Sequence, residues 1–120
     1  MNPGALVIFL AGLVGIFSAI PLIQGRVKMN PWYGIRIPEA FTSEKNWLEI
    51  NAYGGRQLLS FGFVIVVVAL AELFVPRRYW PIANLVALAV IVFWLILAVR
   101  RLYVFAKHYE KPPKGQPPMT

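Results

Sequence analysis

The chain has 120 residues and a net charge of +7, and 58% of its residues are hydrophobic whereas only 14% are charged. A water-soluble domain of this length needs more polar surface than that composition supplies. The absence of cysteine excludes disulfides, thiolate metal sites and a thiol nucleophile.

Three hydrophobic runs are each long enough to cross a bilayer. Residues 3–24 and 79–99 carry no charge, and residues 58–75 carry only Glu72. About 20 apolar residues in a helix span a hydrocarbon core of roughly 30 Å. The sequence therefore predicts an all-α integral membrane protein with spans at about 4–24, 57–75 and 80–100. These spans form one small bundle in a single domain (1–110), and a disordered, basic, proline-rich tail (111–120) follows it.

The first run is expected to stay in the mature protein. It lacks the basic start and the small-residue cleavage site that are typical of a signal peptide. Gly12, Gly15 and Ala19 share one face of this span, and such small residues permit close approach of a neighbouring helix.

Lysine and arginine are divided unevenly between the two sides of the predicted bundle. Ten lie on the side of the connector (25–56) and the tail, namely Arg26, Lys28, Arg36, Lys45, Arg56, Arg100, Arg101, Lys107, Lys111 and Lys114. Only Arg77 and Arg78 lie on the other side. Basic residues mark the cytoplasmic face, so we expect N-out, C-in topology in a bacterial inner membrane. Because the basic residues flank spans, we expect a bilayer as their partner and no nucleic acid.

The connector combines an extended segment with the start of a helix. Proline and glycine favour irregular chain over residues 25–42, and Thr42 or Ser43 can cap a helix running from about Ser43 to Val75. Within that helix, Gly54-Gly55 indicates either a break at the membrane surface or the close approach of another backbone.

Spaced residues in the connector resemble the SdpI family. The pattern is Asn30…Tyr33-Gly34-x-Arg36-x-Pro38, followed by Thr42-x-x-x-x-Trp47-x-x-x-Asn51-x-x-x-Gly55-Arg56. The namesake of this family is an immunity protein against a secreted sporulation-delaying peptide toxin. The resemblance implies a multi-pass membrane protein that confers resistance to a membrane-active peptide and, in the namesake, captures a transcriptional repressor. The namesake has additional spans ahead of this domain, so this chain is a short three-span form.

We expect the connector to form an interfacial cap whose polar groups satisfy one another. The candidate binding or cap-building residues are Asn30, Tyr33, Gly34, Arg36, Thr42, Trp47, Asn51, Gly55 and Arg56. Arg36 either contacts a ligand or pairs with a nearby glutamate, the choices being Glu39, Glu44 and Glu49. Trp47 either anchors a partner peptide or lies in the interfacial aromatic belt. With Asn51 and Gly55 it is a candidate lining of a small polar pocket.

Glu72 is the only carboxylate inside a predicted span, and intramembrane carboxylates are candidates for function. We expect it to reach the outer headgroups and pair with Arg77. The alternative is a coupling carboxylate of a small proton-driven exporter.

These observations leave three functions open. The first is an immunity protein that binds a peptide toxin, a cytoplasmic regulator such as a repressor, or both through residues 30–57. The second is a transporter or exporter subunit, which implies a homo-oligomer, and the third is a membrane scaffold protein. The sequence lacks the catalytic and phosphate-binding motifs of an enzyme, and its one histidine, His108, falls in the polar tail. We therefore expect no enzyme activity, no metal and no cofactor.

Overall fold

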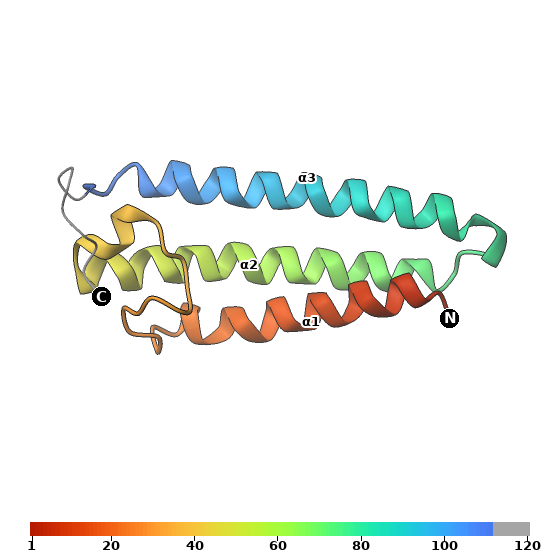
Figure 1. Cartoon of the computed structure of the whole chain (residues 1–120), viewed down its shortest axis with the longest axis horizontal. Coiled ribbons are helices and arrows are strands. Elements are labelled where there is room, and N and C mark those ends of the chain that lie inside the picture. Colours follow the sequence, from red (N-terminus) through yellow and green to blue (C-terminus); the bar gives the residue numbers. More distant parts are fainter. Residues whose placement is uncertain (112–120) are drawn as a thin grey trace.

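Three long helices run side by side in the computed structural model, which describes residues 1–111 (Figure 1). They are α1 (Pro3–Ile23), α2 (Glu44–Glu72) and α3 (Trp80–Ala106), with short 3₁₀ helices η1 (Pro38–Thr42) before α2 and η2 (Arg77–Tyr79) before α3. All three long helices have the length and hydropathy of membrane spans, which confirms the predicted all-α, three-span class. The tail from residue 112 onward, predicted to be disordered, lies outside the described residues.

The central helix of the bundle is α2, which packs against both α1 and α3 (Figure 1). Its contact with α1 depends on small residues. A Cβ atom added to Gly12 would lie 3.1 Å from the Gly62 carbonyl oxygen, and one added to Gly62 would lie 3.0 Å from the Gly12 carbonyl oxygen. Lipid supplies no hydrophobic force between helices, so such close backbone approach is what holds them together. The predicted small-residue face of the first span therefore forms the α1–α2 contact.

The length of α2 exceeds what a bilayer requires. Its 29 residues extend about 44 Å, against roughly 30 Å of hydrocarbon. The excess lies at the start of α2, and the connector wraps around it at one end of the molecule (Figure 1). The helix continues through Gly54 and Gly55 without a break. Another backbone does come close at Gly55, where an added Cβ would lie 3.2 Å from the Ala19 carbonyl oxygen, whereas the neighbour of Gly54 is the Ile35 side chain.

The observed helix ends follow from local chemistry. Ser43 caps α2, its hydroxyl accepting a hydrogen bond from the Asn46 N–H at 3.0 Å. Pro81 occupies the first turn of α3, where its missing N–H costs nothing. The third helix reaches Ala106, beyond the predicted end at residue 100, because Leu102 and Ala106 are buried against the connector.

A hydrophobic core lies where the connector, the start of α2 and the end of α3 meet. Its buried members are Ile37, Ala40, Phe41, Trp47, Ile50, Leu102 and Ala106. We call this part of the molecule the cap and define it as residues 25–56 together with 102–109. The cap core is assembled from segments at the end of the bundle, where water rather than lipid drives the burial of apolar surface.

Candidate functional site

The centre of the cap is a set of hydrogen bonds between Asn51 and the extended segment. The Asn51 Oδ1 atom accepts from the Ile35 N–H at 2.5 Å, and its Nδ2 donates to the carbonyls of Ile35 at 3.3 Å and Trp47 at 2.9 Å. Asn51 is only 1% exposed. The polar pocket predicted around Asn51 is therefore filled by the protein's own backbone.

Gly34 lets the extended segment approach this amide closely. Its φ is +116°, and a Cβ atom there would lie 2.6 Å from Asn51 Oδ1 and 3.1 Å from Trp47 Cζ2. A side chain would thus be strained by the backbone conformation and would also collide with two buried groups. The glycine in the Tyr33-Gly34-x-Arg36 pattern is explained by this contact.

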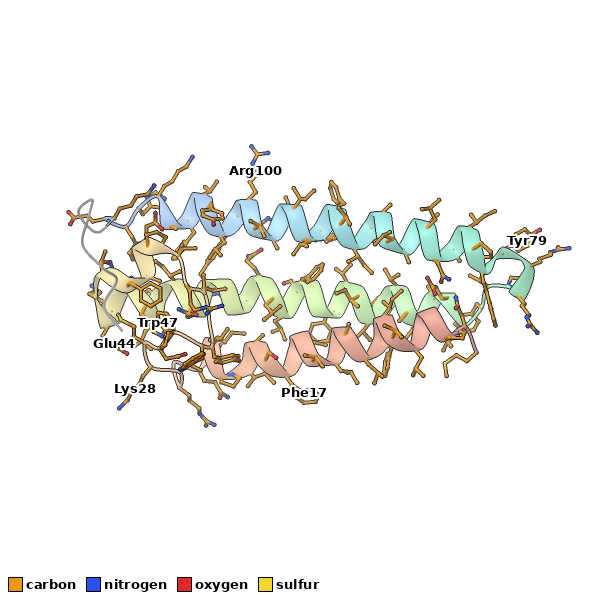
Figure 2. All side chains as sticks on the ribbon, viewed as in Figure 1. Phe17, Lys28, Glu44, Trp47, Tyr79 and Arg100 are labelled. Atoms are coloured by element: carbon orange, nitrogen blue, oxygen red, sulfur yellow. The ribbon has the colours of Figure 1, made fainter. Side chains whose placement is uncertain are left out.

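Trp47 lies inside the cap, between α2 and the connector (Figure 2). Its side chain is fully buried, its Nε1 donates to the Val27 carbonyl at 2.8 Å, and its ring packs against Phe41 at 5.4 Å between centroids. The two expected placements, partner anchor and interfacial belt, both require an accessible ring. Trp47 is instead a core residue, because the connector folds back over it.

Asn30 fixes the tight turn that leads into the extended segment. Its Oδ1 accepts from the backbone N–H groups of Trp32 at 2.8 Å and Tyr33 at 2.7 Å, and its Nδ2 donates to the Lys28 carbonyl at 2.7 Å. The Tyr33 hydroxyl donates to the Ser18 carbonyl of α1. The turn is thereby held both to itself and to the first membrane helix.

Thr42 and Gly55 also have identifiable places. The Thr42 hydroxyl donates to the Glu39 carbonyl at 2.8 Å and accepts from the Asn46 side-chain amide, so it joins η1 to the first turn of α2. Gly55 faces α1 and lies outside the Asn51 network. The spacing of Trp47, Asn51 and Gly55 at four-residue steps places all three on inward-facing positions, with different neighbours.

The outer surface of the cap carries exposed aromatic and basic side chains. Trp32 is 85% exposed, and Arg36 and Arg56 are also exposed. The Arg36 guanidinium donates to the carbonyl of Pro31, the residue before Trp32, and the Arg56 guanidinium carbon lies 5.8 Å from the Tyr53 ring centroid. We refer to Trp32, Arg36 and Arg56 as the cap surface.

Of the two alternatives for Arg36, pairing with a glutamate is not observed within residues 1–111. Glu39 is buried and pairs with Lys111 at 3.7 Å, and Glu49 pairs with Lys45 at 4.0 Å. Glu44 accepts instead from the Met29 N–H, at 3.4 Å. Each carboxylate therefore has another partner, and the charge of Arg36 is left directed outward.

One cap contact was absent from the sequence-based expectations. The Tyr109 hydroxyl donates to Glu49 Oε2 at 2.6 Å and so joins the segment after α3 to the start of α2. Burial, followed by the hydrogen bond to Glu49 and the charge of that carboxylate, raises the pKa of Tyr109 to about 12. Tyr53 and Phe105 stack at 4.1 Å beside it. The signal in the sequence was the four-residue spacing of Phe105 and Tyr109, whose rings lie 5.5 Å apart between centroids.

The expectation that Glu72 reaches the headgroups and pairs with Arg77 is wrong. Glu72 is 4% exposed, and its Oε2 accepts from the Asn2 side-chain amide at 3.1 Å. It shares the inner face of α2 with Ile65 and Ala69, so its side chain is directed toward the bundle. Arg77 lies over the Trp80 ring, at 5.8 Å from the centroid.

Comparison with known proteins agrees with the motif-based resemblance. Residues 26–99 match the SdpI/YfhL protein family, and this range contains the whole spaced pattern, α2 and most of α3. No curated protein and no solved structure gives a significant match. The matched range covers well over half of the 120 residues. The chain therefore belongs to the SdpI/YfhL protein family.

Proposed function

We propose that this chain is a membrane-embedded immunity protein of a bacterial inner membrane and that the cap surface is its recognition element. Family membership suggests an immunity-type membrane protein. The finer proposal rests mainly on the exposure of Trp32, which lies on a turn that the Asn30 side chain holds by hydrogen bonds to the Trp32 and Tyr33 N–H groups. A large aromatic side chain held rigidly in a solvent-facing position can bind a partner at little entropic cost.

Under this proposal, residues of the cap have two kinds of role, and Trp32 joins the residues that the sequence singled out. Five residues build the cap, because their contacts are made within the chain: Asn30, Gly34, Thr42, Trp47 and Asn51. Trp32, Arg36 and Arg56 would contact the ligand. The ligand chemistry that fits them is an amphipathic peptide with an apolar side chain for the indole and a carboxylate for a guanidinium. A membrane-active peptide toxin meets this description, and so does an acidic segment of a cytoplasmic regulator.

The test is survival of toxin-sensitive bacteria that express the chain and are challenged with a sporulation-delaying-type peptide. We expect the parent to protect, and Trp32→Ala and Arg36→Ala to lose protection at matched membrane abundance. Lys45→Ala is the control, because Lys45 is a solvent-facing cation of the same cap whose side chain is 82% exposed. We expect it to protect like the parent.

Variants of the cap interior should behave differently from variants of the cap surface. Trp47→Ala removes a fully buried side chain, at a cost of about 3–5 kcal/mol, and should lower the amount of protein in the membrane. Loss of protection in Trp32→Ala without loss of protein would support the proposal. A parent that gives no protection, or surface variants that protect as well as the parent, would overturn it.

A further inference from the structure

A second polar cluster lies at the end of the bundle opposite the cap, where all three helices contribute one residue. Asn2 precedes α1, Glu72 ends α2, and Asn84 lies in the first turns of α3. The Asn2 amide donates to Glu72 Oε2 at 3.1 Å and to Asn84 Oδ1 at 2.8 Å, and Asn2 Oδ1 caps α1 by accepting from the Gly4 N–H at 3.0 Å.

One carboxylate oxygen in this cluster has no hydrogen-bond donor. Glu72 Oε1 is buried without a partner, and both hydrogens of the Asn2 amide are already engaged. Within residues 1–111 the ion pairs are Lys45–Glu49 and Lys111–Glu39, both at the cap. A buried acceptor that lacks a donor is costly, more so when it belongs to an acidic group. Glu72 Oε1 can therefore accept a hydrogen bond from a donor that comes from outside the chain.

Glu72 also lines an open groove between α2 and α3 with a volume of ≈ 330 Å³. The remaining lining residues are all apolar: Val68 and Ala71 of α2, Val75 just after α2, and Ala83, Val86, Ala87 and Val90 of α3. On α3 these positions recur at i, i+3, i+4 and i+7, and on α2 Val68, Ala71 and Glu72 lie at i, i+3 and i+4, so the groove runs along both helices. Alanine on both walls keeps the two helices from filling it.

We propose that this groove binds a small hydrophobic primary amine. The ammonium group would donate to the Glu72 carboxylate, and the apolar body would lie along the valines and alanines. Rotation about the terminal torsion of Glu72, which is soft, turns either oxygen toward the groove. The commitment to a monocation rests on charge complementarity, because the groove offers one carboxylate and no basic side chain. A divalent cation would need more oxygen ligands than Glu72 and Asn84 provide.

The test uses the purified parent chain in neutral maltoside micelles with dansylcadaverine, a fluorescent primary alkylamine. We expect saturable binding that dodecylamine displaces and dodecanol, which has the same chain length and no charge, does not. This comparison needs no variant, so it decides the proposal even if altered chains fold poorly. Equal displacement by dodecanol, or no saturable binding, would overturn the proposal.

Variants then locate the site. Glu72→Gln should weaken amine binding about tenfold or more, because a charge-assisted hydrogen bond is lost. Ala83→Leu should block binding by filling the groove without touching the carboxylate. Glu110→Gln, the same chemical change at an exposed carboxylate at the cap end, should bind like the parent. Unchanged binding by Glu72→Gln would show that the amine binds elsewhere. The outcome of these amine-binding measurements does not depend on toxin protection, because the proposed toxin site is the cap surface at the other end of the bundle.

Discussion

The side-chain amide of Asn51 hydrogen bonds both the N–H and the C=O of Ile35, which lies sixteen positions earlier in the chain. This pair of bonds docks an extended backbone segment onto a membrane helix in the way that a neighbouring strand would in a sheet. It explains why this chain carries both an asparagine on the helix and a glycine beside Ile35.

Removing the Asn51 amide should destabilise the cap. Asn51→Ala leaves the Ile35 N–H and C=O without partners at a part-buried position, at a cost of about 1–3 kcal/mol. The measurement is thermal unfolding in maltoside micelles, followed by circular dichroism. Gln24→Ala changes an exposed side chain at the end of α1 and should leave the midpoint unchanged. Equal midpoints for both variants would contradict the role assigned to Asn51.

Gly25 and Gly34 both have positive φ. Comparing them separates the effect of the close contact at Gly34 from the effect of its backbone conformation. Gly25→Ala and Gly34→Ala both place a side chain in an unfavourable backbone region, with φ of +69° and +116°. Only at position 34 would the new Cβ also collide with Asn51 and Trp47, because nothing lies within 4 Å at position 25. We expect Gly34→Ala to lower the unfolding midpoint clearly more than Gly25→Ala does. The reverse order would disprove the close approach.

The α1–α2 contact yields a similar graded series. A methyl group at Gly12 would lie 2.7 Å from a Val66 methyl and one at Gly62 would lie 2.8 Å from Ile16, whereas the nearest atom to one at Gly15 is 3.7 Å away. Gly12→Ala and Gly62→Ala should therefore separate the helices and reduce resistance to unfolding by SDS. Gly15→Ala should be tolerated. If all three behave alike, the contact does not have the geometry described here.

Tyr109 should titrate anomalously. Burial and the Glu49 carboxylate favour the protonated phenol, raising its pKa from 10.0 to about 12. The Tyr109–Glu49 hydrogen bond contributes fully to the free energy of unfolding below pH 10, and this contribution is lost as the pH rises toward 12. Absorbance at 295 nm, taken as the difference between parent and Tyr109→Phe, should show a late transition. Glu49→Gln should move that transition toward 10, and a transition already near 10 in the parent would contradict the contact.

The cysteine-free sequence makes the orientation directly measurable. Lys28→Cys marks the cap end and Arg78→Cys marks the opposite end, and both positions are exposed. Because nine of the eleven basic residues within 1–111 lie on the cap side, an impermeant maleimide should label Arg78→Cys in intact cells. It should label Lys28→Cys only after permeabilisation. The opposite labelling pattern would reverse the proposed topology.

The sequence was sufficient to predict the elements of the fold, because hydrophobic length and proline placement are local properties. The helix that we expected over residues 43–75 is Glu44–Glu72, and its cap is Ser43, one of the two residues expected there. Gly54-Gly55 left two alternatives open, since a glycine pair suits either a break or a close contact. The choice depended on Ile35, Leu22 and Ile23, which only the tertiary structure brings there.

The sequence identified most of the residues of the candidate site but predicted their roles less well. Trp47 was expected to be accessible because an aromatic residue near a span is commonly interfacial, but the connector folds over it and supplies the Val27 carbonyl. Glu72 was expected to pair with Arg77 because the two are close in sequence. Its actual partner, Asn2, is seventy positions away in sequence and meets it at the open end of the hairpin formed by α1 and α2. Such contacts depend on helix rotation, which hydropathy alone does not determine.

The uninterrupted course of α2 has a mechanical consequence. This one helix carries Trp47 and Asn51 at one membrane surface and Glu72 at the other, and its glycine pair is packed on both sides and cannot act as a hinge. A tilt or axial rotation imposed at either surface is therefore transmitted across the bilayer. Close glycine contacts fix α1 to α2, whereas only 6% of the apolar stretch of α3 is buried, so α3 is coupled to α2 mainly at its two ends, through Leu102 and Ala106 in the cap and through Asn84 at the opposite end.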